Sequence, residues 1–198
     1  MADILSDRYQ AALSRAFELH QRQYRKDSRI PYLAHLLTVS ALVMEHKGDE
    51  DQAIAALLHD AVEDQGGRPT LESIKRQFGD KVADIVEGCT DAYAQPKPPW
   101  KGRKSAYLAR LMDANDSILL VSLADKVHNA RSILNDLKNG DASVWDKFTG
   151  GKEGTLWYYQ SLVEIFDKSS FTALKNELHQ LVDEITKRAQ IMEANDYD

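Results

Sequence analysis

Histidine and acidic side chains gather in one short and otherwise apolar stretch, LLHDAVED, which contains His59, Asp60, Glu63 and Asp64. In a helix, residues three and four positions apart share a face, so one imidazole and three carboxylates approach the same side. Partly buried carboxylates repel one another and lose hydration, a cost that a bound cation offsets. The spacing therefore predicts a divalent metal site.

Two further segments can complete this site. His35 lies in the apolar segment PYLAHLLTV, and Asp125 lies in SLADKVHNA, where an unpaired buried carboxylate would be costly. A lone histidine on an apolar helix is usually a core residue, and an adjacent His–Asp pair is a short motif, so the prediction rests on the combination. Two nitrogens and two oxygens suit Mn, Fe, Zn or Co better than Ca. The expected ligands are His35, His59, Asp60 and Asp125.

A metal held in this way lowers the pKa of a bound water and neutralises charge on a phosphate ester under in-line attack. Glu63 and Asp64 then remain for proton transfer. His128 follows Asp125 by three residues and competes as a ligand, but orientation of a true ligand is its favoured role. The histidines expected to be structural or exposed are His20, His46 and His179.

The elements expected to position these residues are helical almost throughout, because apolar residues recur at three- and four-residue spacing and alternating strand patterns are scarce. Pro31 favours a helix that runs through His35 to about Lys47. Asp49 can cap the next helix, which carries AIAALLHDAVED. The sequence thus predicts an all-α fold.

The rest of the chain continues this pattern. Thr70 is expected to cap a short helix through Phe78, and another helix follows Gly79. The apolar run from Asp116 to Gly140 predicts a central buried helix. Two more helices, one containing LWYYQSLVEIF and one over about 170–193, complete the fold.

Basic residues occur in two clusters, YRKDSR and WKGRK. The second belongs to AQPKPPWKGRK, which holds three of the five prolines and predicts a loop over residues 94–104. Single basic residues are usually solvated surface charges. In an acidic chain, clusters beside a metal motif indicate an anionic small ligand. Trp100 is expected to pack within this loop rather than stack on a base.

Composition limits the classes of protein and partner. A chain of 198 residues with 43% hydrophobic residues is expected to form one domain over 1–198. A net charge of −6 argues against nucleic acid as the main partner, and no apolar run is long enough to span a membrane. The lone Cys89 excludes an intrachain disulfide and favours a reducing, cytoplasmic location. The sequence is compatible with a homo-oligomer.

The segments RKDSRIPYLAH, LLHDAVED and SLADKVHNAR resemble, in this order, successive motifs of the hydrolase domain of the Rel/SpoT alarmone enzymes. The resemblance runs from about His20 to Phe166 and is nearest to the stand-alone small alarmone hydrolases. It implies a single-domain helical bundle of the HD superfamily and a metal, usually Mn, at the four ligands named above. The implied reaction removes the 3′-pyrophosphate from guanosine tetra- or pentaphosphate and gives GDP or GTP and pyrophosphate.

The same resemblance implies roles for further residues. Glu63 and Asp64 match the carboxylate pair that handles the attacking water. Arg25 and Lys26 match a basic pair that lies against the nucleotide base, and Asn129 matches an Asn that contacts substrate. The implied substrate-binding residues are Arg25, Lys26, Lys104, Asn129 and Tyr158.

Three alternatives stay open at the level of the sequence. The same site could act on an adenosine alarmone or on the 2′-phosphate of NADPH. A general HD nucleotidase or phosphodiesterase is a more distant alternative, because one fold hosts several reactions. A non-catalytic nucleotide sensor is the non-enzyme alternative, against which the intact Glu63 and Asp64 argue.

Overall fold

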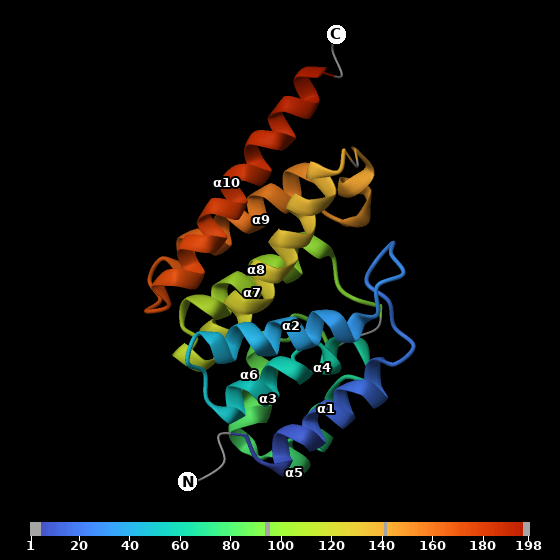
Figure 1. The fold of residues 1–198 in the computed structure, drawn as a ribbon, viewed down its shortest axis with the longest axis vertical. Helices are drawn as coiled ribbons and strands as arrows, with labels where there is room; N and C mark the ends of the chain where they lie inside the picture. Colours follow the sequence, from blue (N-terminus) through green and yellow to red (C-terminus); the bar gives the residue numbers. More distant parts are fainter. Residues whose placement is uncertain (1–4, 94–95, 141, 196–198) are drawn as a thin grey trace.

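The computed structural model describes residues 5–93, 96–140 and 142–195, which are helical and contain no strand (Figure 1). An isolated bridge joins Tyr24 and Pro31. The elements in chain order are α1 (Asp7–His20), α2 (Tyr32–Glu45), α3 (Glu50–Leu58), α4 (Ala61–Asp64), α5 (Arg68–Phe78), α6 (Asp80–Cys89), α7 (Trp100–Met112), α8 (Asp116–Lys138), the 3-10 helix η1 (Ala142–Lys147), α9 (Gly151–Phe166) and α10 (Thr172–Asn195). The predicted all-α class is confirmed.

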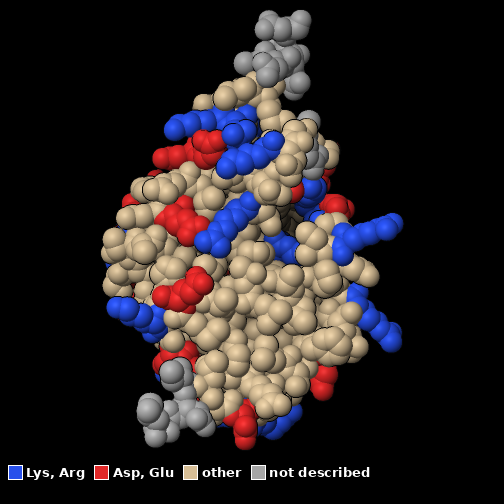
Figure 2. Space-filling model, viewed as in Figure 1, with Lys and Arg blue, Asp and Glu red and all other residues tan. Residues whose placement is uncertain are grey.

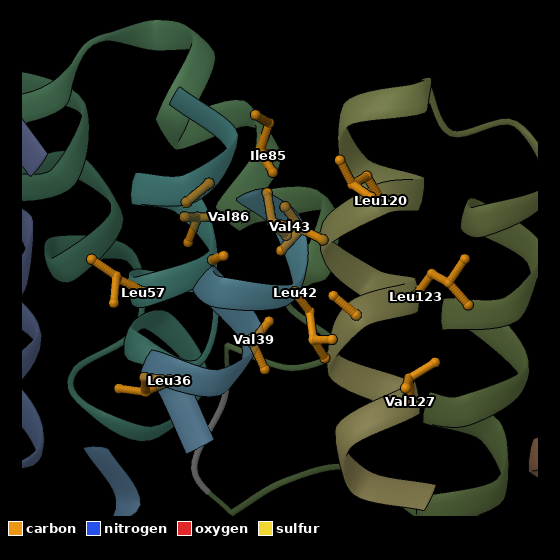
Figure 3. Packing of buried hydrophobic residues seen from close by; sticks show 14 of the residues in the cluster. Leu36, Val39, Leu42, Val43, Leu57, Ile85, Val86, Leu120, Leu123 and Val127 are labelled. Carbon is orange, nitrogen blue, oxygen red and sulfur yellow. The ribbon is translucent and has the colours of Figure 1, made fainter. Parts of the chain in front are cut away.

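Helix α8 forms the centre of the core, and α2, α3, α6 and α10 pack against it. In Figure 3, Leu42 of α2 points toward α8, near Val39 and Val43, while Leu123 and Val127 lie on the side of α8 that faces away from α2. Burial of each such side chain stabilises the fold by about 1.5–3 kcal/mol. The predicted central buried helix is confirmed, and it carries Asp125 into the interior.

The connection between α2 and α3 is short and specific. A Cβ at Gly48 would meet the side chain and carbonyl oxygen of Val43, so this turn requires glycine. Asp49 caps α3 as predicted: its carboxylate accepts from the Gln52 N–H, and the Gln52 side chain accepts from the Asp49 N–H. The turn returns the chain antiparallel, so the start of α2 lies beside the end of α3.

The prediction of one continuous helix over 53–64 is wrong. Helix α3 ends at Leu58, His59 and Asp60 form a turn, and α4 begins at Ala61. The His59 Nδ1–H donates to the Ala56 carbonyl oxygen at 2.8 Å. A side chain that bonds to a carbonyl one turn earlier competes with the helical hydrogen-bond ladder and bends the chain. The bend places His59 and Asp60 at the C-terminal end of the apolar α3, where His59 is buried.

The helix expected through Phe78 exists, but Thr70 is not its cap. Helix α5 begins at Arg68 after Gly67, whose φ of 64° lies in the left-handed region. The Thr70 hydroxyl donates to the Gln65 carbonyl oxygen at 2.6 Å. Thr70 therefore ties the first turn of α5 to the preceding turn of the chain instead of capping the N-terminus of the helix.

The predicted loop over 94–104 is shorter than expected. Residues 94 and 95 lie outside the described residues, and α7 already begins at Trp100. Pro99 precedes it with φ −50°, a value suited to the start of a helix. The Trp100 indole packs over Gly150 and Gly154, in agreement with a packing role. Arg103 and Lys104 are consequently held on a helix.

The last two helices, α9 and α10, confirm the predicted C-terminal pair. Helix α10 packs along α8 and α9, and its C-terminal end extends past the remainder of the molecule at the top of Figure 1. Within the described ranges, no helix has both the length and the apolar character needed to cross a bilayer.

Candidate metal centre

The four predicted metal ligands come from three parts of the chain. His35 lies in the first turn of α2, His59 and Asp60 form the turn between α3 and α4, and Asp125 lies midway along α8. Donor atoms of His35, His59 and Asp125 lie within 4.8 Å of one another, and the three residues are buried. The structure therefore brings together ligands that are up to 90 positions apart in sequence.

Asp60 lies outside that group of three but faces the same nitrogens. Its Oδ2 is 3.0 Å from His59 Nε2 and 3.5 Å from His35 Nε2. The corresponding distances for Asp125 Oδ1 are 3.6 and 3.2 Å, so the two carboxylates stand in similar relation to the imidazoles. The Tyr32 hydroxyl donates to Asp60 Oδ2 at 2.6 Å and helps to hold it there.

Hydrogen bonds on the far side of each ring orient the two imidazoles. His59 Nδ1 donates to the Ala56 carbonyl, so the neutral ring presents its Nε2 lone pair to the carboxylates. His35 Nδ1 lies 2.7 Å from His128 Nδ1. Burial and the neighbouring His35 lower the pKa of His128 to about 4, so His128 is neutral and can accept the His35 proton. His128 thus orients a ligand, as the sequence analysis favoured.

The charges around the two Nε2 atoms call for a cation. Burial alone would lower the pKa of His59, but Asp60 and Asp125 raise it well above its ordinary value. Burial alone would raise the pKa of Asp125, but Lys126 and the two histidines hold it well below its ordinary value. Both Nε2 atoms are buried and have no hydrogen-bond partner among the described residues. A divalent ion fits here, since it would replace the proton and satisfy both nitrogens.

A polar cavity of about 150 Å³ opens beside these ligands. Four residues with predicted catalytic or substrate-binding roles, Glu63, Lys104, Asn129 and Tyr158, line it, and the buried Tyr158 hydroxyl has no partner among the described residues. The other lining residues are Tyr32, Asp60, Cys89, Asp91, Tyr107, Asp125 and Lys126. Cations and carboxylates thus surround a space that suits a phosphate group beside a metal.

Asp91 organises one wall of this cavity. Its side chain is only 3% exposed, and its carboxylate lies 2.6 Å from Lys104 Nζ and 2.5 Å from Arg103 Nη1. Burial alone would raise the pKa of Asp91, but Lys104, Glu63 and Arg103 hold it well below its ordinary value. Burial and the Asp91 charge raise the pKa of Glu63 to about 7. The proton that these two carboxylates share therefore resides on Glu63.

The two predicted catalytic carboxylates occupy different surroundings. Glu63 lines the cavity, and its Oε1 accepts from Lys97 Nζ at 2.6 Å. Asp64 is absent from the lining; its Oδ2 accepts from Gln23 Nε2 at 2.8 Å. Burial and the Asp60 charge raise the pKa of Asp64. Glu63 therefore lies in the cavity beside the predicted ligands, whereas Asp64 lies outside the cavity lining.

Sequence reasoning missed Asp91 and Lys126. Lys126 of α8 has a side chain that is only 12% exposed, lines the cavity and pairs with Asp125. The sequence could have indicated a role for Lys126, because a lysine inside an apolar helical run needs a partner. Asp91 follows the end of α6 as an isolated acid, and no local pattern distinguishes it from a turn residue.

A second cavity of about 350 Å³ adjoins the first, and the two share Tyr32 and Asn129. Arg25 and Lys26, the basic pair predicted to lie against the base, line it. Arg25 Nη2 donates to Asn129 Oδ1 at 2.9 Å, and Asn129 Nδ2 donates to Asp125 Oδ1 at 2.5 Å. Figure 2 shows this side of the molecule hollowed, with Lys and Arg atoms in and around the hollow and few charges on the lower half. A hydrogen-bond chain therefore connects the second cavity to Asp125, one of the predicted metal ligands.

Comparison with known proteins identifies the family of this chain. A model of the HD domain matches residues 12–155. The chain is 38% identical over 135 residues to the guanosine-3′,5′-bis(diphosphate) 3′-pyrophosphohydrolase MESH1 of Xenopus tropicalis, which covers 67% of this chain and 70% of that protein. It is 33% identical over 60% of its length to a probable guanosine-3′,5′-bis(diphosphate) 3′-pyrophosphohydrolase of Synechocystis, of which it spans only 16%.

Solved structures agree with the sequence comparisons. A structure described as a metazoan ortholog of SpoT that hydrolyzes ppGpp superposes with a TM-score of 0.75 at 25% identity, and covers 92% of this chain and 98% of that one. The protein lmo0812 of Listeria monocytogenes superposes with a TM-score of 0.67 at 29% identity, covering 77% of this chain and 99% of that one. The chain belongs to the HD-domain family, and its helical bundle is the fold of that superfamily.

Proposed function

We propose that this chain is a metal-dependent pyrophosphohydrolase that removes the 3′-pyrophosphate from guanosine tetra- or pentaphosphate, giving GDP or GTP and pyrophosphate. The observation that carries the proposal is the convergence of two unpartnered histidine nitrogens and two carboxylates on a cavity that Lys104 and Lys126 also line. The guanosine-3′,5′-bis(diphosphate) 3′-pyrophosphohydrolase activity for which the MESH1-type relatives are named supports the same substrate.

His35, His59, Asp60 and Asp125 would hold the metal, which we propose to be Mn, although another divalent transition metal would fit the same donors. When bound, the ion supplies a lowered pKa for a coordinated water and neutralises charge on the phosphate. The Ala56 carbonyl and His128 keep the two ligand nitrogens aimed at it.

Glu63 is the residue that we assign to proton transfer. Its carboxyl group lines the cavity and has a pKa near 7, a value suited to accepting a proton from water and returning it near neutral pH. Asp64 acts beside it without entering the cavity: it holds Gln23 and lies 3.6 Å from Lys97, which in turn contacts Glu63. Asp64 thereby positions Lys97, which contacts the Glu63 carboxyl group.

The substrate-binding residues divide between the two cavities. Lys104, Tyr158 and Asn129 line the smaller one and would contact the diphosphate that is cleaved. Arg25 and Lys26 line the larger one, where a planar guanidinium can stack on a base. We further propose that residues 1–198 act as one domain and that the protein works in the reducing cytoplasm, as its single cysteine suggests.

The direct test measures product release. The purified protein is stripped with a chelator and resupplied with Mn, and pyrophosphate release is followed from guanosine and adenosine 3′,5′-bis(diphosphates) beside phosphate release from NADPH. We expect metal-dependent turnover of the guanosine compound. Faster turnover of another compound would change the substrate and keep the chemistry, whereas binding without turnover of any would identify a sensor.

Asp125→Ala tests the metal assignment, with Asp116→Ala as the matched control. Asp116 is exposed in the first turn of the same helix, far along α8 from the ligands. We expect loss of both Mn binding and turnover in Asp125→Ala and neither loss in Asp116→Ala. Preserved turnover in Asp125→Ala would refute the ligand set.

A further inference from the structure

The second cavity contains an ion pair to which no role has been assigned. Lys147 Nζ lies 3.0 Å from Asp136 Oδ2, and both residues line the cavity. Asp136 comes from α8 and Lys147 from the end of η1, where the Lys147 carbonyl oxygen accepts from Lys26 Nζ. The Asp136 side chain is 35% exposed and the Lys147 side chain 19% exposed, so the pair is accessible from the cavity without being a free surface pair.

We propose that the Asp136–Lys147 pair selects guanine over adenine in the bound nucleotide. This inference rests on the proposed function, because it takes the second cavity as the site of the base when the 3′-diphosphate lies beside the metal ligands.

The position of the pair along α8 supports this assignment. Asn129 borders both cavities, and Asp136 follows it by seven residues, close to two helical turns. The pair therefore lies about 10 Å farther along α8 than Asn129. A ribose at Asn129 would leave the far edge of a purine ring facing the pair. The apolar side chains Ile133 and Phe148 line the same cavity and suit the faces of a planar ring.

The chemistry of the pair matches one purine edge. Guanine presents an acceptor, O6, next to two donors, N1–H and the N2 amino group. An ammonium beside a carboxylate supplies a donor next to acceptors in the same order, because a carboxylate only accepts and an ammonium only donates. Adenine presents an amino donor next to the N1 lone pair. In the same pose, its amino donor would face the Lys147 ammonium and its N1 acceptor would face the Asp136 carboxylate. The pair thus favours guanine and disfavours adenine.

Asp136→Asn is the test variant, because the amide keeps the shape of the side chain and replaces one acceptor with a donor. Asp146→Asn is the matched control: Asp146 precedes Lys147 on η1, is exposed, and does not belong to the cavity lining. The measurement is kcat/KM for guanosine and adenosine 3′,5′-bis(diphosphates) with Mn. We expect Asp136→Asn to lower the guanosine-to-adenosine ratio by about 10- to 100-fold, and Asp146→Asn to leave the ratio unchanged.

The outcomes separate this inference from the proposed function. A wild-type protein that turns over the guanosine compound while Asp136→Asn keeps the same ratio would overturn base selection and leave the function standing. A wild-type preference for the adenosine compound would also overturn it. If the wild type turns over neither compound, the function fails, and equilibrium binding of GDP and ADP to both variants still decides the inference: an equal GDP-to-ADP affinity ratio in wild type and Asp136→Asn would refute it.

Discussion

Replacing Glu63 with glutamine is expected to stabilise the metal-free fold while abolishing turnover. In its neutral form the Glu63 carboxyl group donates to Asp91 and accepts from Lys97. A glutamine amide can do both, since its NH2 donates and its carbonyl oxygen accepts. The variant therefore keeps the hydrogen bonds of the protonated acid and loses the group that takes a proton from water.

The magnitude follows from the pKa of Glu63, which burial and the Asp91 charge raise from 4.5 to about 7. Because the folded state holds this proton more tightly than the unfolded state, the group's contribution to stability is fully present below about pH 4.5 and is lost as the pH rises to about 7. The shift corresponds to about 3 kcal/mol above pH 8. A weaker contact of the neutral amide with Lys97 reduces this, so we expect a gain of about 1–3 kcal/mol.

Urea unfolding in the presence of a chelator measures this difference at pH 4.5 and pH 8.5. Comparison of the variant with the wild type at each pH cancels the titration of groups that do not interact with Glu63. We expect nearly equal stabilities at pH 4.5 and a more stable variant at pH 8.5, whereas the exposed Glu72→Gln should show no such change between the two values. A Glu63→Gln variant that is less stable than the wild type at pH 8.5 would refute the assignment of the proton to Glu63.

Three further predictions concern positioning and packing. His128→Phe removes the acceptor for His35 Nδ1 and should weaken Mn binding by about 10- to 100-fold in calorimetry; unchanged affinity would show that His35 is oriented without it. Gly88→Ala places a Cβ 2.6 Å from Ile118 Cδ1 between α6 and α8, and should destabilise the fold by about 1–3 kcal/mol in urea. In the control variant Gly102→Ala, the added Cβ would have no neighbouring atom within 4 Å, so we expect a gain of about 0.5–1 kcal/mol in the free energy of unfolding. A loss of stability in this variant would contradict the exposed position of Gly102 in α7. Asp49→Ala breaks the capping box of α3 and should cost about 1 kcal/mol, and an unchanged midpoint of thermal unfolding would show that the cap is dispensable.

The sequence predicted most of the helical fold because its signals are local. The spacing of apolar residues identified α8 and both C-terminal helices, and Asp49 marked the start of α3. The convergence of His35, His59, Asp60 and Asp125 could also be anticipated, since buried polar residues in apolar helices need a partner, but their role as metal ligands stays a prediction. Asp91 was not predictable, because its role depends on Lys104 and Glu63, which reach it only through tertiary packing.

The two larger errors in the predicted helices fall at the candidate site, and this follows from what a site requires. A continuous helix through His59 would keep Asp60 in the ladder and on a different side of the axis, whereas the turn lets both donor groups face His35. Likewise, the early start of α7 fixes Lys104 on a rigid element beside Asp91, where a loop would leave it mobile. Local patterns describe what each segment prefers alone. Where several segments must place side chains around one small polar cavity, tertiary packing determines the backbone conformation. Helix boundaries there depart from those that the local sequence pattern predicts.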